Sequence, residues 1–167
     1  MFLSLLSVVA VFATSVSSPS SGASGSGQMQ ISSAMVAGCG AVSRDQIEAA
    51  IGLLVAHSTE EQSKFGSTCR YSAGDTVVEI SIQHLTHPLD LSAELESLRT
   101  DIPGSKLREV AGLAEHAYAV EIPDAGTQLH VLPGEREYFM VSVLGLDAGH
   151  HGFDAALKIA QAVLKRR

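Results

Sequence analysis

Apolar residues recur at helical spacing in three segments of the chain, at residues 47–54, 91–98 and 153–164. Each segment places its apolar side chains on one face of a helix, and the last forms one continuous stripe. The positions are Ile47, Ala50, Ile51 and Leu54; Leu91, Leu95 and Leu98; and Phe153, Ala156, Leu157, Ala160, Val163 and Leu164. The pattern therefore predicts three amphipathic helices.

Capping residues set the expected limits of the first two helices. Ser43 and Gln46 have the spacing of a capping box, and Gly52 is suited to end that helix in the left-handed conformation. Pro88 and Asp90 are expected to open the second helix, and Pro103-Gly104 to end it.

Five shorter segments read as strands, near residues 67–71, 76–83, 115–121, 128–132 and 137–144. The clearest is Thr76 to Gln83. There Val78, Ile80 and Ile82 alternate with Glu79, Ser81 and Gln83, as in a strand that is buried on one side. Turns are expected at residues 72–75 and at Pro133-Gly134, and residues 56–66 read as a loop.

The expected order is α-β-β-α-β-β-β-α, without a βαβ repeat. This order predicts an α+β fold, with an antiparallel sheet of about five strands and helices packed on one face. Residues 39–167 are expected to form this single domain.

The N-terminal residues read as a targeting segment. Phe2 to Ala13 is apolar, uncharged and too short to span a membrane, as in a signal peptide, although no Lys or Arg precedes it. We expect a signal peptide at residues 1–17 and a flexible Ser- and Gly-rich linker at residues 18–38. The protein is therefore expected to be secreted or to reside in the cell envelope, without a membrane span.

Cys39 and Cys69 are the only two cysteines. In an exported protein such a pair predicts a disulfide, which would close a loop of about 31 residues. Val36-Ala37-Gly38-Cys39 also has the form of a lipobox, and a lipidated Cys39 would have no sulfur left for Cys69. Both interpretations of Cys39 remain open at this level.

Charge narrows the range of partners. The chain carries 11 Lys and Arg against 18 Asp and Glu, a net charge of −7. This balance disfavours nucleic acid, which is bound through clustered cations. No motif calls for a cofactor, so none is predicted.

Several of these residues resemble a broad group of bacterial exported proteins and lipoproteins, mainly actinobacterial. The shared pattern is a Cys, a short capped helix that ends in Gly, a Cys-x-Tyr strand, and a Gly-Leu segment that leads to Ala-Tyr. Here it is carried by Cys39, Ser43 to Gly52, Cys69-Arg70-Tyr71, Val110 to Leu113 and Ala117-Tyr118. Ala114 departs from the pattern, which prefers Gly. The group has no assigned activity, so the resemblance implies export and fold and no catalytic residue.

Candidate site residues are few. Tyr71, Tyr118 and Tyr138 fall on predicted strands, where aromatic rings on an open sheet face suit ligand binding and rings on a core face are simply packed. His84 and His87 are the candidates for a metal site, but a metal needs three or four converging ligands, and loop histidines explain this pair as well. No catalytic residue is predicted.

We therefore expect a non-catalytic binding module for a small molecule, a lipid or an envelope protein. The alternatives are a metal-dependent or hydrolytic enzyme, and a protein-interaction or assembly domain.

Overall fold

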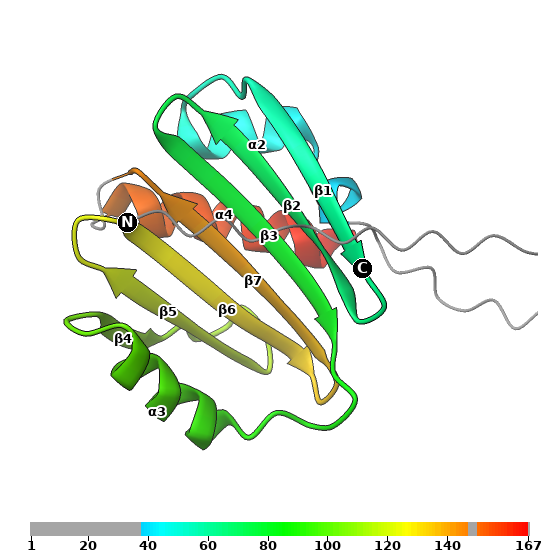
Figure 1. The fold of residues 1–167 in the computed structure, drawn as a ribbon, viewed down its shortest axis with the longest axis vertical. Coiled ribbons are helices and arrows are strands. Elements are labelled where there is room, and N and C mark those ends of the chain that lie inside the picture. Colours follow the sequence, from blue (N-terminus) through cyan, green and yellow to red (C-terminus); the bar gives the residue numbers. More distant parts are fainter. Residues whose placement is uncertain (1–37, 147–149, 167) are drawn as a thin grey trace, which may run out of the picture. The chain divides into compact units, whose positions relative to one another are not determined.

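The computed structural model describes residues 38–146 and 150–166, all of which belong to one unit, residues 34–167 (Figure 1). The predicted signal peptide, and the predicted linker up to residue 37, lie outside the described residues. Among the described helices, none is both long enough and apolar enough to cross a membrane.

The unit contains four helices and seven strands in its described part. The helices are α1 (Gly38–Ala41), α2 (Arg44–Ile51), α3 (Leu91–Asp101) and α4 (His150–Lys165). The strands are β1 (His57–Ser63), β2 (Gly66–Ala73), β3 (Thr76–His84), β4 (Lys106–Glu109), β5 (His116–Ile122), β6 (Gly126–Gly134) and β7 (Glu137–Leu144).

All strands join one antiparallel sheet in the order β1-β2-β3-β7-β6-β5-β4. Two meanders, β1–β3 and β4–β7, meet where β3 pairs with β7 (Figure 1). The predicted α+β class and antiparallel sheet are confirmed. The predicted count of about five strands and the predicted order are wrong, because β1 lies in a segment that was expected to be a loop and β4 lies in a segment for which no element was predicted. Both are edge strands. All seven residues of β1 are exposed, and β4 has only four residues, of which Leu107 alone is apolar. Neither strand therefore shows an alternation of apolar and polar residues.

One face of the sheet, here called the inner face, packs against α1, α2 and α4. In Figure 1, α4 runs behind the strands. Its buried residues Ala156, Ile159, Ala160 and Val163 belong to the same core as the inner-face side chains of five strands. These side chains are Cys69, Tyr71, Ala73, Val78, Ile80, Ile82, Ala117, Ala119, Leu129, Val131, Phe139, Val141 and Val143.

The opposite face, the outer face, carries α3. On β5, Ala117 and Ala119 belong to the inner core, whereas Tyr118 and Val120 belong to a second cluster with the leucines of α3. Because alternate residues of a strand point to opposite faces, α3 covers the face that α4 does not. The prediction that the helices share one face is therefore wrong. A leucine stripe identifies the buried side of a helix but not the face of the sheet that receives it.

The predicted caps of α2 and α3 are confirmed, but Leu54, which the helical spacing placed on the first helix, lies beyond α2 and is exposed. The Ser43 hydroxyl accepts from the backbone N–H of Gln46, the Gln46 side chain accepts from the backbone N–H of Ser43, and Gly52 ends α2 with φ of 73°. Asp90 caps α3 through the backbone N–H of Ala93. The expected turn at Pro133-Gly134 is displaced, because both residues belong to β6 beyond a register shift.

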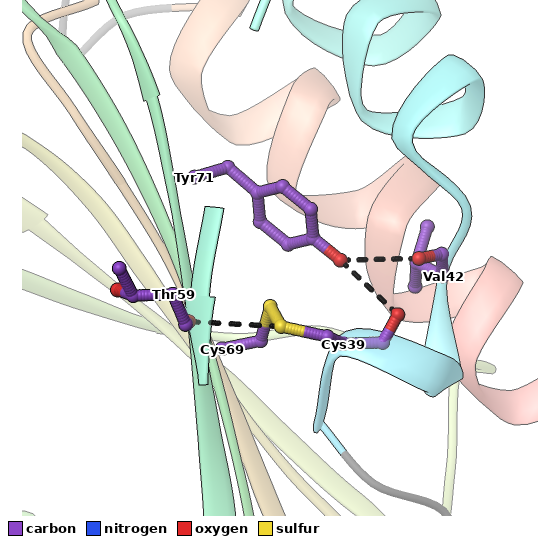
Figure 2. Close-up of a disulfide and its surroundings, with 5 residues drawn as sticks. All are labelled: Cys39, Val42, Thr59, Cys69 and Tyr71. Carbon is purple, nitrogen blue, oxygen red and sulfur yellow. Dashed lines mark hydrogen bonds between the residues drawn. A yellow bond between two sulfur atoms is a disulfide. The ribbon is translucent and has the colours of Figure 1, made fainter. Parts of the chain in front are cut away.

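The Cys39–Cys69 disulfide is present and joins α1 to β2, with 4.9 Å between the two Cα atoms (Figure 2). The Tyr71 hydroxyl lies on the same side, where it donates to the carbonyl of Val42 at 3.1 Å and lies 3.4 Å from that of Cys39. The sulfur of Cys39 lies 3.6 Å from the carbonyl oxygen of Thr59. This contact is not a hydrogen bond, because a disulfide sulfur carries no hydrogen. The disulfide and Tyr71 together hold α1 against the inner face.

Candidate ligand-binding site

Three aromatic residues gather on the outer face, on three neighbouring strands. Tyr118 on β5 lies directly opposite His130 on β6, and their rings stack with centroids 4.8 Å apart and planes at 14°. Tyr138 on β7 places its hydroxyl oxygen 2.8 Å from Nδ1 of His130. We call Tyr118, His130 and Tyr138 the aromatic cluster.

Burial sets the charge state of the aromatic cluster. His130 is only 3% exposed, and burial lowers its pKa to about 4, so its imidazole is neutral at neutral pH. Burial also raises the pKa of Tyr118 and of Tyr138 well above the usual value for a phenol. The negative charge of Glu94 on α3 adds to both shifts. The cluster is therefore uncharged at neutral pH.

Two atoms of the aromatic cluster are buried without a hydrogen-bond partner among the described residues. They are the hydroxyl oxygen of Tyr118 and Nε2 of His130. Buried polar atoms in proteins are nearly always paired, because an unpaired one costs about 1–3 kcal/mol. The two atoms thus mark a place where the fold gives up stability.

A cavity of about 290 Å³ lies between α3 and the edge of the sheet, with Tyr118 in its wall. We call it the α3 cavity. Leu91 and Leu95 of α3 and Leu107 of β4 supply its apolar surface. The remaining lining residues are Arg99, Arg108, Glu109, His116 and Ala117. This volume is at the lower end of small-molecule sites, which measure roughly 300–1,000 Å³.

A second cavity, of about 140 Å³, adjoins the same helix. It shares Leu91 and His116 with the α3 cavity, and Leu89 and Leu132 also line it. The first turn of α3 and the residues before it therefore have open space on two sides.

The predicted tyrosines do not converge. Tyr118 and Tyr138 join the aromatic cluster, whereas Tyr71 lies on the inner face with its hydroxyl bonded to the backbone of α1 and the turn after it. Burial raises the pKa of Tyr71 too, with a smaller contribution from Glu60. Tyr71 is therefore placed to hold α1.

The candidate metal residues are both exposed, His84 at the end of β3 and His87 in the loop that follows. Within residues 38–146 and 150–166, no three His, Cys, Asp or Glu side chains lie close enough to hold a metal together.

Sequence reasoning did not single out His130 and Glu94. His130 falls within a correctly predicted strand, where Leu129 and Val131 mark the opposite, apolar face. The register of β5 and β6 would have identified His130, because it places His130 directly opposite Tyr118.

The outer face beyond α3 is polar, as the alternation of β3 predicts. Glu79, Ser81 and Gln83 lie on this face, opposite Arg70, Thr68 and Gly66 of β2. Arg70 pairs with Glu79 at 3.6 Å, and the Thr68 hydroxyl donates to that of Ser81 at 3.2 Å. These groups satisfy one another, whereas the hydroxyl of Ser142, which lies opposite Glu79 on the same face, is buried without a partner among the described residues, as is that of Thr127.

No protein-family model, no curated protein and no solved structure matches this chain. The resemblance to bacterial exported proteins therefore stays a prediction, and the functional proposal depends on the geometry of the site.

Proposed function

We propose that this protein is a non-catalytic binding module that takes a small, mainly apolar ligand into the α3 cavity. The observation that carries the proposal is the α3 cavity itself, a space walled by Leu91, Leu95 and Leu107 with Tyr118 of the aromatic cluster in its wall. A mostly apolar pocket with a few polar groups that fix orientation is the usual form of a small-molecule site.

The attachment of α3 supports the proposal. No residue of α3 is fully buried, and the helix contacts the sheet through the partly buried Leu91, Leu95 and Leu98. A helix held by so few contacts can move outward at small cost and admit a ligand. By contrast, α4 buries six residues in the inner core or beside it.

A binding role is favoured over hydrolysis because the aromatic cluster lacks a nucleophile. Its hydrogen bond joins an imidazole to a phenol whose raised pKa opposes ionisation. An assembly domain would instead present an exposed apolar patch, and the large exposed apolar side chains of the described residues are only Leu53, Leu54 and Phe65.

We further propose that the protein acts outside the cytoplasm, as the predicted signal peptide and resemblance imply. The Cys39–Cys69 disulfide supports this, since such bonds persist in oxidising compartments. Mass spectrometry of the protein released by the producing cells would test it. An N-terminus between Thr14 and Ser18 is expected, and intact Met1 in the cytoplasm would contradict export.

The binding proposal is tested by extracting purified protein with organic solvent and identifying co-purified molecules, followed by thermal shift with each. A ligand at 100 times its dissociation constant adds about 2.7 kcal/mol to stability. Leu95→Trp, which fills the α3 cavity, should abolish the shift, whereas Leu54→Trp at an exposed position should not. A zinc-dependent shift together with ester or peptide turnover would favour the enzyme instead.

A further inference from the structure

We infer that the protein has a second binding site, for a neutral sugar ring, in a groove at the end of the β1–β2 hairpin. This site is separate from the α3 cavity and shares no lining residue with it. The groove has a volume of about 340 Å³, which is within the range of small-molecule sites. Phe65 lines it together with polar residues, among them Glu61, Gln62, Thr68, Ser81 and Gln83. We call it the Phe65 groove.

The Phe65 groove lies on a part of the sheet that the described helices leave open. On the outer face, α3 packs over β4 to β7 through its leucines, and α1, α2 and α4 pack on the inner face (Figure 1). The outer face of β1, β2 and β3 is therefore accessible to a ligand among the elements that the structure describes.

Two rows of residues cross these three strands and form the floor of the groove. Glu61, Thr68 and Ser81 pair directly across β1, β2 and β3, and the next row contains Gly66 opposite Gln83. Gly66 is required by the backbone, because a Cβ there would overlap the carbonyl oxygen of the residue before Gln83. Since glycine has no side chain, the second row is open in its middle.

The ring of Phe65 is presented by a turn whose backbone is fixed. The N–H of Phe65 donates to the hydroxyl of Ser63 at 3.2 Å, and its carbonyl accepts from the N–H of His84 at 2.8 Å. The side chain is nevertheless 49% exposed. The ammonium of Lys64 lies 4.5 Å from the ring centroid, over one face, so the other face is the one left for a ligand. A ring held in this way loses little conformational entropy when it binds.

The chemistry of the lining residues indicates a sugar. A pyranose ring has faces of C–H groups, which pack on the electron-rich face of an aromatic ring, and a rim of hydroxyl groups that donate and accept. The amides of Gln62 and Gln83 also donate and accept, and the carboxylate of Glu61 accepts. All three side chains are exposed, so they can reach a ligand directly. Within the described part of the chain, the side chains of Glu61 and Gln62 have no partner of their own.

Gln83 is oriented by the residues beneath it. Its amide nitrogen lies 3.5 Å from the hydroxyl of Ser81, which also accepts from the hydroxyl of Thr68 at 3.2 Å. Ser81 is only 8% exposed, so its role is to position Gln83 and not to contact the ligand. Polar groups that are held in place before binding fix the orientation of a ligand in a small-molecule site.

Charge around the Phe65 groove favours a neutral sugar. Glu61 is the only ionised side chain among its lining residues, and its carboxylate would repel a sugar acid. The ammonium of Lys64, beside the ring of Phe65, would repel an amino sugar. A neutral sugar avoids both repulsions.

The experiment titrates the purified full chain with four neutral disaccharides and follows its backbone amides by NMR. The probes are maltose, lactose, mannobiose and N,N′-diacetylchitobiose, with 3′-sialyllactose as an anionic and chitobiose as a cationic counterpart. At least one neutral probe should give saturable shifts at residues 61–68 and 81–83, with a dissociation constant on the order of 1 mM. No saturable shift with any of the four, or shifts only elsewhere, would overturn the inference. Tighter binding of a charged counterpart than of every neutral probe would overturn the neutral class.

Variants test whether the ring and the amide make the contact. Phe65→Ala should weaken binding by at least about tenfold, and Phe65→Tyr, which keeps the ring, should not. Leu54→Ala removes another exposed apolar side chain and should leave the affinity unchanged. Gln83→Ala, at an exposed position, should also weaken binding and serves as the test if Phe65→Ala fails to fold. Affinities equal to that of the wild type in the folded variants of Phe65 and Gln83 would overturn the inference.

The same titration separates this site from the α3 cavity. Leu95→Trp fills the α3 cavity and should leave the sugar affinity unchanged, because Leu95 does not line the Phe65 groove. Loss of sugar binding in Leu95→Trp would place the sugar in the α3 cavity and overturn the inference.

Discussion

Tyr118 on β5 and His130 on β6 lie directly opposite each other with stacked rings, and each keeps one hydrogen-bonding atom buried without a partner in the described part of the chain. Tyr71, on the other face of the same sheet, has its hydroxyl satisfied by the backbone carbonyl of Val42. The contrast between the two phenols leads to the first prediction.

Tyr118→Phe should stabilise the unliganded protein by about 1 kcal/mol, because it removes a buried hydroxyl that has no partner. Tyr71→Phe should instead destabilise it by about 1 kcal/mol, because it leaves a buried carbonyl unpaired. Urea unfolding of the two variants measures both effects. Equal losses in both would mean that the Tyr118 hydroxyl is bonded in solution.

Stability should fall in mild acid because of His130. Burial holds its pKa at about 4 in the folded protein, whereas the unfolded chain has the ordinary value of about 6.5. The unfolded state therefore binds a proton first as the pH falls. The contribution of His130 is constant above about pH 6.5 and is lost between about pH 6.5 and 4, by roughly 3 kcal/mol.

The measurement for His130 is urea unfolding at several pH values, compared with His130→Gln. The variant should lose less stability over this interval than the wild type. His84→Gln, which changes an exposed histidine, should follow the wild type. Parallel curves for the wild type and His130→Gln would contradict the assignment.

Removal of the disulfide should lower the free energy of unfolding. The bond joins residues 30 apart, and loop closure of that size is worth roughly 3–4 kcal/mol. Cys39→Ala with Cys69→Ala should lose this amount in urea unfolding, and the wild type should approach the variant when a reductant is added. Two thiols that react in unreduced, denatured protein would show that the bond does not form.

Two glycines of β6 should respond oppositely to alanine. Gly126 has φ of 147°, and a Cβ there would overlap the carbonyl oxygen of Val143. Gly126→Ala should therefore cost about 3 kcal/mol or more. Gly134 has open space around it, so Gly134→Ala should change stability by less than about 0.5 kcal/mol. Thermal unfolding of both variants measures the difference. Similar unfolding temperatures for Gly126→Ala and Gly134→Ala would contradict the strained backbone at Gly126.

The fold was predictable where a short residue pattern is compatible with only one local structure. Ser43 with Gln46 is a capping box wherever it occurs at a helix start, and Val78, Ile80 and Ile82 can only line one side of a strand. β1 could not be predicted, because an edge strand without apolar residues is defined by its hydrogen bonds to β2, which the sequence of β1 does not encode.

The site was predictable only in part, for a related reason. Tyr118 and Tyr138 were named, but Tyr71 lies on the opposite face and His130 was not singled out. Whether two strand residues meet depends on the order and register of strands distant in sequence. Here β6 separates β5 from β7 and aligns His130 with Tyr118.

The central pairing of β3 with β7 also determines the order in which the sheet can be completed as the chain is synthesised. Val77 pairs with Leu144 and His84 with Glu137. More than fifty residues must therefore be synthesised after β3 before its second neighbouring strand, β7, is complete. During that interval the β1–β3 meander has a bare edge on β3, the strand that later pairs with β7, the central strand of the sheet. Such an edge is a template for pairing with other chains. A chain arrested before β7 should therefore aggregate through β3, and a chaperone that shields extended segments would act on this interval of synthesis.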